Sequence, residues 1–440
     1  MEHGNYDVII IGGGFTGVTA ARELNQKGYK TVILEARDRL GGRTWFDHRM
    51  GRNLEMGGTW VHWFQPHVWA EITRYQLDVV PSPVPDKAYW ISNNEAHTGT
   101  IDELFGSVDK GMNELLADSQ KYFPLPYKPL QADNLKEMDH LTVTDMLKRL
   151  DLTADEYDIM HSIWALNFNG SPEEGGISQT YRWAALSNYN WVLMMDICAS
   201  FKLAKGTKEL LERIASDADT DIFLSKVVSS IAKTGENYTV TTKDGEHFKG
   251  KTVINTLPLN ILNSIDYQPA LSIKKQQAGA EGQTSKGVKF WAKVKGLTEP
   301  MLLFQPADYP INYAQYEYAD GDDGIIVGFG PDATKLDPEN RVEVEEALRH
   351  CLPDIEVIES TGHDWVADEF AGETWPMQRN NQLSDYLAEL QRPEDGLFIA
   401  GADYANGWAG FIDGAIESAF STTRKVYAYL RKLSQNETTV

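Results

Sequence analysis

Cysteine is almost absent from this sequence of 440 residues, which contains only Cys198 and Cys351. Two thiols so far apart give no support for a disulfide framework, and they lack the spacing of paired metal ligands. Long apolar runs are missing as well, since no window reaches the ~20 residues that a transmembrane helix requires. The sequence therefore predicts no metal site and no membrane span, and a reducing compartment suits it.

The N-terminus offers little room before the first predicted strand. Apolar residues that fit a buried strand begin near Tyr6. A secretory or transit peptide needs a longer leader than this. We therefore expect a cytoplasmic protein.

Basic side chains are scarce relative to acidic ones. The sequence has 41 lysines and arginines against 64 aspartates and glutamates, a formal net charge of −23. This charge repels phosphate backbones and anionic lipids, so nucleic acid is not an expected partner. It attracts small cations, but the same charge also serves solubility alone, and both interpretations stay open.

Apolar and aromatic residues are plentiful. Hydrophobic residues make up 42% of the chain, with 12 Trp, 19 Tyr and 16 Phe. This composition is typical of a packed globular protein and not of a disordered one. A chain of 440 residues exceeds what one core usually holds, so two or three domains are expected.

The first forty residues predict a dinucleotide-binding unit. Asp7–Ile11 is an unbroken apolar run, as in a parallel strand buried on both faces. The following glycines have separate uses: Gly12 permits a tight turn, Gly14 lets a pyrophosphate approach the backbone, and Gly17 lets helix and strand pack closely. Eighteen residues after Gly17, at the end of a second apolar segment, Glu35 has the spacing of an acid that binds a ribose hydroxyl.

The continuation of this unit favours FAD over a nicotinamide cofactor. Residues 35–44, EARDRLGGRT, form a cationic loop bent by glycine, which suits a second phosphate approach of a long cofactor. Residues 54–63 then join Gly57 and Gly58 to an aromatic cluster. In a flavoprotein such a segment suits backbone contact with the isoalloxazine ring, and the alternative is a core loop of bulky packing residues.

Residues 6–44, YDVIIIGGGFTGVTAARELNQKGYKTVILEARDRLGGRT, resemble the flavin-containing monoamine oxidase family, and the similarity extends to the last helix. Residues 57–77 are most similar to the fungal monoamine oxidases and the bacterial nicotine oxidases. The resemblance implies an α/β fold, with a Rossmann-like FAD-binding domain of the glutathione-reductase type and an interleaved α+β substrate domain. The residues that should bind FAD are Gly12, Gly14, Phe15, Thr16, Gly17, Glu35, Ala36, Arg37, Gly42, Arg43, Gly57, Gly58, Thr59, Trp60, Val228, Asp403 and Ile412.

Changes in the pattern of apolar residues divide the chain into five segments. Helical periods dominate from about Pro81 to Phe201, sheet character returns over 222–256, and a strand followed by a glycine loop and a helix closes the chain. We therefore predict that the FAD-binding domain is made of residues 1–80, 201–275 and 369–440, and the substrate domain of residues 81–200 and 276–368.

The resemblance assigns an aromatic cage and a lysine to the active face. Trp375 and Phe411 map to the two rings before the flavin, where apolar walls and ring quadrupoles would steer a neutral amine. Lys286 matches the lysine that holds a water against flavin N5, and Lys289 is the competing candidate. Leu166, Met195 and Ala199 fall where the fungal enzymes line the substrate pocket, although they would serve equally well as helix core.

Thr374 occupies the place of the cysteine that links flavin covalently in the animal enzymes. Threonine cannot form that thioether, so the resemblance implies FAD held non-covalently. Asp403 stands where most relatives carry glutamate.

The implied activity is FAD-dependent oxidation of a primary or secondary amine. A hydride moves from the α-carbon to flavin N5, the imine is hydrolysed to an aldehyde or ketone, and O2 or a protein electron acceptor re-oxidises the flavin. The alternatives are a nicotine-type cyclic amine oxidase, an L-amino acid oxidase, for which Arg182 is the nearest candidate to pair the substrate carboxylate, and a non-catalytic dinucleotide-binding scaffold. A homodimer is compatible with the sequence.

Overall fold

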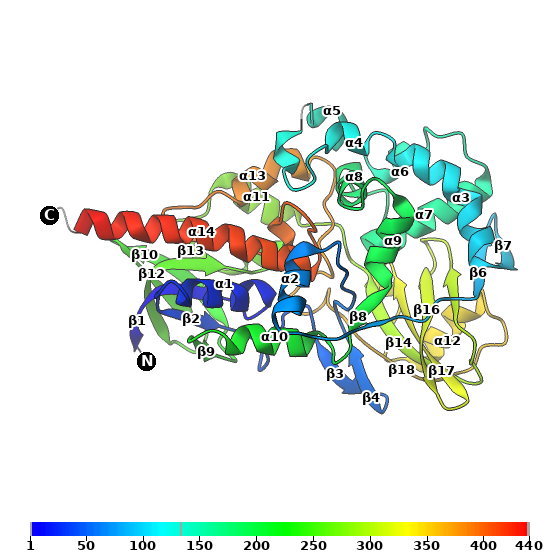
Figure 1. Cartoon of the computed structure of the whole chain (residues 1–440), viewed down its shortest axis with the longest axis horizontal. Coiled ribbons are helices and arrows are strands. Elements are labelled where there is room, and N and C mark those ends of the chain that lie inside the picture. The colour runs from blue at the N-terminus through cyan, green and yellow to red at the C-terminus, as the bar shows by residue number, and fades with distance from the viewer. Residues whose placement is uncertain (1, 133, 438–440) are drawn as a thin grey trace.

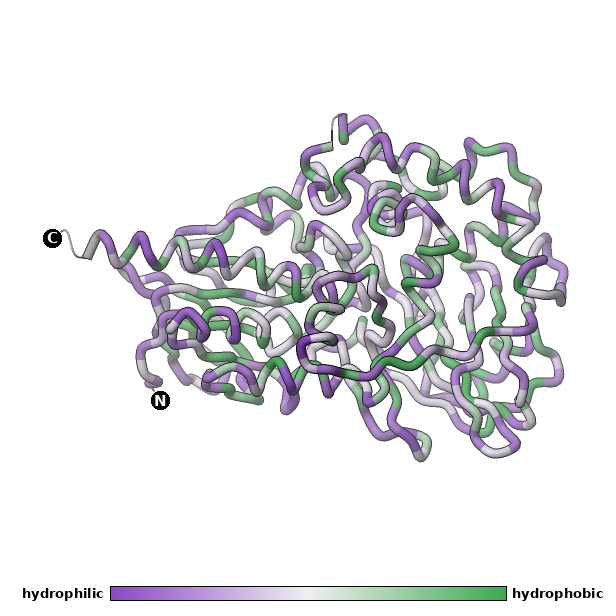
Figure 2. Tube along the Cα trace, viewed as in Figure 1, coloured by the Kyte–Doolittle hydropathy of each residue, from purple (hydrophilic) through white to green (hydrophobic). Residues whose placement is uncertain are grey.

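The computed structural model describes residues 2–132 and 134–437. Its backbone is built around two β-sheets, with the two termini at one end of an elongated molecule (Figure 1). The apolar segments follow the strands and the inner helix faces, and hydrophilic segments follow the outer turns (Figure 2).

The first sheet has eight strands in the order β13-β10-β11-β12-β1-β2-β9, and β19 pairs with β12 beside this path. Its central strands β12, β1, β2 and β9 are parallel, and β10, β11 and β12 form antiparallel hairpins. The strands are β1 (Glu2–Ile11), β2 (Thr31–Leu34), β9 (Asp221–Phe223), β10 (Val228–Thr234), β11 (Asn237–Thr242), β12 (His247–Asn255), β13 (Asp266–Gln268) and β19 (Leu397–Ile399).

Helices far apart in sequence cover one face of this sheet. The first helix packs against the last, and each of them also contacts one further helix on this face (Figure 1). Their buried side chains form one core with those of the parallel strands. The helices are α1 (Phe15–Asn25), α2 (Pro66–Arg74), α10 (Thr207–Ser216) and α14 (Ile412–Glu437).

The second sheet has seven strands in the order β18-β14-β17-β16-β15-β6-β7. All neighbouring pairs are antiparallel except β15 and β6, which are parallel. The strands are β6 (Lys87–Ser92), β7 (Glu95–Gly99), β14 (Val288–Val294), β15 (Met301–Phe304), β16 (Tyr313–Asp320), β17 (Asp323–Gly330) and β18 (Val357–His363).

An inserted helical region covers the second sheet and shares a large apolar core with it. These helices lie above the sheet in Figure 1. They are α3 (Ile101–Leu116), α4 (Ser119–Tyr122), α5 (Lys136–Asp139), α6 (Val143–Leu147), α7 (Ala154–Phe168), α8 (Ile177–Leu186) and α9 (Trp191–Ala199). Three further helices lie at α11 (Ile273–Glu281), α12 (Arg341–Arg349) and α13 (Ala388–Leu390), and two small ribbons pair β3 (Phe46–Arg49) with β4 (Arg52–Glu55) and β5 (Val79–Pro81) with β8 (Phe201–Leu203).

One sequence prediction of local structure needs correction. The region from Pro81 to Phe201 is not helical throughout, because β6 and β7 form a hairpin joined at Asn93 and Asn94, which both have positive φ. Asparagine tolerates this conformation and favours tight hairpin turns. The predicted domain boundary at 275/276 falls inside α11, whose Ala278 packs in a core of the eight-stranded sheet.

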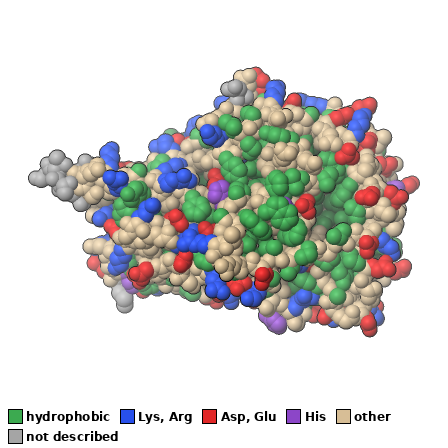
Figure 3. All heavy atoms as spheres, in the orientation of Figure 1, with side chains coloured by type: hydrophobic (Ala, Val, Ile, Leu, Met, Phe, Trp, Pro, Cys, Tyr) green, Lys and Arg blue, Asp and Glu red, His purple; other side chains and the backbone are tan. Residues whose placement is uncertain are grey.

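On the face seen in Figure 3, charged side chains gather mainly along the edges, and apolar side chains are most numerous in the middle and to the right. Large apolar side chains near α2 and on α9 are exposed, among them Trp63, Phe64 and Val192. Within the residues described, no helix has the length and apolar character needed to cross a bilayer.

Candidate active site

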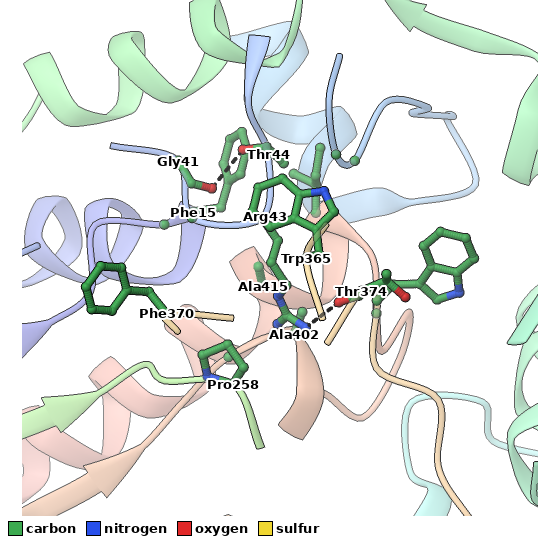
Figure 4. A pocket seen from close by; sticks show the side chains of 18 of the residues that line it. Phe15, Gly41, Arg43, Thr44, Pro258, Trp365, Phe370, Thr374, Ala402 and Ala415 are labelled. Atoms are coloured by element: carbon green, nitrogen blue, oxygen red, sulfur yellow. Dashed lines mark hydrogen bonds between the residues drawn. The ribbon is translucent and has the colours of Figure 1, made fainter. Parts of the chain in front are cut away.

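One cavity of about 540 Å³ runs from the first glycine turn to the inserted helices. It is lined by residues of both sheets and of α7, α8 and α9. The cavity therefore lies between the two sheets and the inserted helices. Figure 4 shows side chains of the first loop, the 365–374 segment and the last helix converging on it. Most of the predicted site residues line this cavity, and three do not.

The end of the cavity nearest β1 is a cradle of backbone. Gly14 is the N-cap of α1 and no side chain caps this helix end, so its N–H groups are free to face a ligand. A side chain at Gly14 would meet only the Gly41 carbonyl oxygen, 3.9 Å away, and would otherwise fill the cavity. This arrangement fits the pyrophosphate of a dinucleotide.

Gly17 has a packing role and does not line the cavity. A Cβ at this position would lie 2.0 Å from the carbonyl oxygen of Gly12, so α1 approaches the turn as closely as only glycine allows. This close packing is the role that the sequence predicts for Gly17, and a contact between Gly17 and the cofactor stays a prediction.

The carboxylate of Glu35 lies beside this cradle and is held by backbone. Gly13 N–H donates to its Oε2 over 2.6 Å and Arg37 N–H donates to its Oε1 over 2.8 Å. The side chain is buried, yet it lines the cavity. Because each carboxylate oxygen accepts more than one hydrogen bond, Glu35 retains capacity for ribose hydroxyls.

Arg43 reaches across the cavity floor to two buried carboxylates, Glu373 and Asp403. It also donates to the carbonyl oxygen of Thr374 over 2.9 Å, as drawn in Figure 4. Burial, reinforced by the neighbouring Asp403, raises the pKa of Glu373 well above its ordinary value. Arg43 therefore fastens the first loop to the C-terminal segments.

Asp403, which is predicted to bind FAD, does not line the cavity. One of its oxygens accepts from Arg43, and the other accepts from Leu259 N–H over 2.8 Å. The carboxylate thus contributes to the site by holding Arg43 and not by facing a ligand.

Lys286 lies outside the cavity and Lys289 lies in its wall. The Lys286 side chain is 52% exposed, with its Nζ 3.6 Å from a Glu174 oxygen. Lys289, on β14, is buried and donates from Nζ to Gly57 O over 2.7 Å and to Thr59 Oγ1 over 2.6 Å. Burial lowers the pKa of Lys289 to about 7, against the attraction of Glu55 and Glu317. Of the two candidate lysines, the structure therefore brings Lys289 to the cavity wall and leaves Lys286 outside it.

Two aromatic rings predicted to form a cage both face the cavity. Trp375 donates from Nε1 to the Asn167 carbonyl over 2.9 Å, and its ring lies edge-on to Phe329 at 5.7 Å. Phe411 is held edge-on by Trp183 and Trp408, each at 5.1 Å. Such contacts lock both rings in place.

Thr374 lines the cavity beside Trp375, and its hydroxyl is engaged within the protein. Asn169 donates from Nδ2 to Thr374 Oγ1 over 3.1 Å, and Ser285 Oγ is in hydrogen-bond contact with the same oxygen. Asn169 is itself fixed in the left-handed conformation that ends α7. No thiol is present at this position.

The inserted helices close the far end of the cavity. Leu166, Met195 and Ala199 line it as predicted, together with Cys198 and Asn167. Arg182 does not line it, because its guanidinium donates to Gln179, to Gln378 and to the carbonyls of Ala405 and Asn406. Apart from Lys289, no basic side chain of the described chain lines this end.

A buried polar cluster behind the cavity wall was missed in the sequence. Glu317 on β16 accepts from Lys202, from Ser82 Oγ over 2.9 Å and from Gln315 Nε2 over 2.9 Å. Gln315 accepts in turn from the hydroxyl of Tyr313. The available signal was the alternation of these residues along an otherwise apolar and aromatic strand.

The comparisons with known proteins agree with this geometry. The model of the family described as flavin containing amine oxidoreductase matches residues 15–426. The chain belongs to this family. It is a flavin-dependent amine oxidoreductase, and the family implies FAD as cofactor, an amine as substrate and an electron acceptor.

Similar proteins span nearly the whole chain. A pseudooxynicotine dehydrogenase from Pseudomonas sp is 37% identical over 439 residues, covering 98% of this chain and 88% of its own. A nicotine dehydrogenase from Pseudomonas putida is 34% identical, covering 96% and 88%. A solved triple mutant of putrescine oxidase has a TM-score of 0.84 at 21% identity, covering 96% of this chain and 99% of its own, which shows the same α/β fold.

Proposed function

We propose that this amine oxidoreductase oxidises a primary or secondary amine at the carbon beside its nitrogen, giving an imine that hydrolyses to an aldehyde or ketone. The observation that carries the proposal is that one cavity contains both a dinucleotide-binding half and a substrate half. The dinucleotide cradle around Gly14 and Glu35 opens into a space walled by Trp375, Phe411 and Lys289. When bound, FAD supplies the two-electron acceptor for the substrate carbon–hydrogen bond.

The residues of the cradle would hold the cofactor without a covalent link. Glu35 would bind the ribose and the N-terminus of α1 the pyrophosphate. The cavity-lining positions Ala36, Arg37, Gly42, Gly58, Trp60, Val228 and Ile412 would enclose the rest. Thr374 offers a hydroxyl, already hydrogen-bonded, in place of a thiol.

The substrate half favours an uncharged amine. Trp375, Phe411, Leu166 and Met195 surround it with apolar surface, and burial disfavours the charged form of an amine. The two rings would orient the nitrogen, and no acid or base is needed if the amine arrives neutral. We therefore expect the rate to fall at acidic pH.

The names of two relatives, pseudooxynicotine dehydrogenase and nicotine dehydrogenase, support an amine carrying an aromatic substituent. An L-amino acid oxidase is less well supported, since Arg182 is turned away from the cavity. A non-catalytic scaffold has no use for the buried Lys289 and the ring pair.

A two-step experiment tests the proposal. The purified holoenzyme is mixed without oxygen with a panel of amines, including aryl-substituted secondary and cyclic amines, and with phenylalanine. We expect amines, and not the amino acid, to bleach the flavin absorbance. Air is then admitted, and the rate at which colour returns separates O2 from other acceptors. A flavin that no amine bleaches would overturn the proposal.

A further inference from the structure

The Glu317 cluster does more than fill space behind the wall. Its carboxylate has a fully buried side chain and receives three donors, from Lys202, Ser82 and Gln315. Glu317 itself does not line the cavity, but Gln315 does. A β-bulge between Tyr316 and Tyr318 interrupts the strand register at Glu317, and such bulges re-aim side chains.

The charge on Glu317 sets the direction of the hydrogen bonds that lead to it. An ionised carboxylate only accepts, so the Gln315 amide must present its Nε2 to Glu317. Its Oε1 then faces Tyr313 and must accept from the phenol. The single hydroxyl proton of Tyr313 is therefore donated to Gln315. Only the lone pairs of the Tyr313 oxygen remain to interact with a ligand.

A second branch runs in the same direction. The indole of Trp60 can only donate, and it donates from Nε1 to Ser82 Oγ over 3.1 Å. The Ser82 proton is therefore free to go to Glu317. Both Trp60 and Tyr313 line the cavity, and both donate away from it.

Asn167, on another wall, has the same polarity. Its Nδ2 donates to the Ile163 carbonyl over 3.0 Å and contacts the Met195 sulfur at 3.9 Å. Its Oδ1 has no hydrogen-bond partner among the described residues, and the residue lines the cavity. Two acceptors, on different elements, thus belong to the substrate half.

We propose that Glu317 is a positioning residue that sets the hydrogen-bond polarity of the substrate half, so that the ligand group meeting Tyr313 must be an N–H or O–H donor. A carbonyl, an ether, a carboxylate or an unprotonated aromatic nitrogen is rejected at this position, because two acceptors would face each other. Applied to the proposed function, on which this step rests, the substrate is an amine that keeps an N–H or carries a hydroxyl.

Binding of a matched ligand pair to the oxidised holoenzyme tests this selection. Indole and benzofuran have nearly the same shape and no charge, and they differ in an N–H donor against a ring oxygen. Neither has an amine to oxidise, so each Kd is read from the perturbation of the flavin absorbance without turnover. We expect the wild-type protein to bind indole about tenfold more tightly, the value of one hydrogen bond in a buried site.

Substitutions in the cluster then assign the selection to Glu317. In Glu317→Gln the new amide can donate to Gln315, which turns over and lets Tyr313 donate into the cavity. We expect the indole preference to fall to about twofold or less. Gln315→Met cuts the same path without touching the Lys202 pair, so it should have the same effect if Glu317→Gln fails to load flavin.

Two control variants guard against a general loss of structure. Ser82→Ala removes the Trp60 branch and one donor to Glu317, but it leaves the path from Glu317 through Gln315 to Tyr313 in place. Glu299→Gln removes a carboxylate from an exposed pair with Lys87. Both should keep the tenfold preference. The inference is overturned by equal binding of the two ligands to the wild type, by absence of binding, or by an unchanged preference in both Glu317→Gln and Gln315→Met.

The outcome is independent of turnover. A protein whose flavin is bleached by amines but that does not prefer indole contradicts only the polarity of the wall. A protein that prefers indole but is bleached by no amine contradicts only the proposed function.

Discussion

Replacing Lys289 by methionine should slow the flavin chemistry and leave the fold in place. In the native protein, Nζ donates to Gly57 O and Thr59 Oγ1. Two of the three ammonium protons are therefore used by the wall. The third proton remains available to a bound group that approaches Nζ. As a neutral amine the same nitrogen has only two protons, and it then presents a lone pair instead.

The size of the effect follows from this contact. A hydrogen bond to a charged group contributes roughly 1.5–3 kcal/mol in a buried site. If the ammonium stabilises charge that develops on the flavin during reduction, its loss should lower the rate about 10- to 100-fold. Methionine fills similar volume, so we expect Tm to change by only a few degrees.

The charge state of Lys289 also determines how the rate of flavin reduction should change with pH. Burial lowers the pKa of Lys289 to about 7, so its positive charge is present below that pH and lost above it. The rate of flavin reduction at saturating amine should therefore fall on the alkaline side. Negative charge beside Nζ favours the ammonium, so it moves this limb to higher pH and never to lower pH. The acidic limb belongs to the substrate amine.

Stopped-flow reduction without oxygen, measured across pH, provides the test. Lys286→Met is the matched control, because that lysine is half exposed and does not line the cavity. We expect the alkaline limb to be missing in Lys289→Met and kept in Lys286→Met. An equal rate loss in both variants, or an alkaline limb that survives in Lys289→Met, would refute the reasoning.

Three further outcomes are expected. Glu35→Ala should weaken FAD binding about 10- to 100-fold in a titration of the apoprotein, because a buried acceptor of hydrogen bonds is lost. Acid precipitation should release all flavin into the supernatant, since Thr374 cannot form a thioether. Glu71→Gln should lower the free energy of unfolding by about 3 kcal/mol, because it leaves the buried guanidinium of Arg22 without its bidentate partner.

Each of these has its own control. Asp38→Ala removes an exposed carboxylate of the same loop and should leave the FAD Kd unchanged. Flavin that stays with the acid pellet would contradict a non-covalent link. Glu23→Gln removes the more exposed partner of Arg22 and should cost far less stability than Glu71→Gln, so equal losses would argue against the buried pair.

The cofactor end of the site was predictable because its information is local. Strand, glycine turn, helix and acid follow one another within about thirty residues, and each has a backbone requirement that few residue types meet. The hairpins of β10, β11 and β12 were predictable for the same reason, since Gly235 and Gly245 mark their turns and both have positive φ.

The family resemblance also allowed site residues to be predicted in the inserted helices and near the end of the chain. It placed Trp375, Phe411, Leu166, Met195 and Ala199 at the cavity, where the structure has them. Composition and spacing alone would have assigned these residues to the core.

Only the tertiary structure decided between groups whose sequence surroundings are alike. Lys286 and Lys289 are three residues apart, and the choice depends on where β14 begins and which side of it faces the cavity. The sequence predicted that Asp403 binds FAD, whereas in the structure its oxygens accept hydrogen bonds from Arg43 and from Leu259 N–H.

The sequence by itself determined the dinucleotide fold and the class of cofactor, because local backbone demands select glycine and acid at set spacings. The tertiary structure determined the polarity of the substrate wall. Lys202, Ser82 and Glu317 come from three distant segments, and the direction of a hydrogen bond depends on every group in the chain that leads to it.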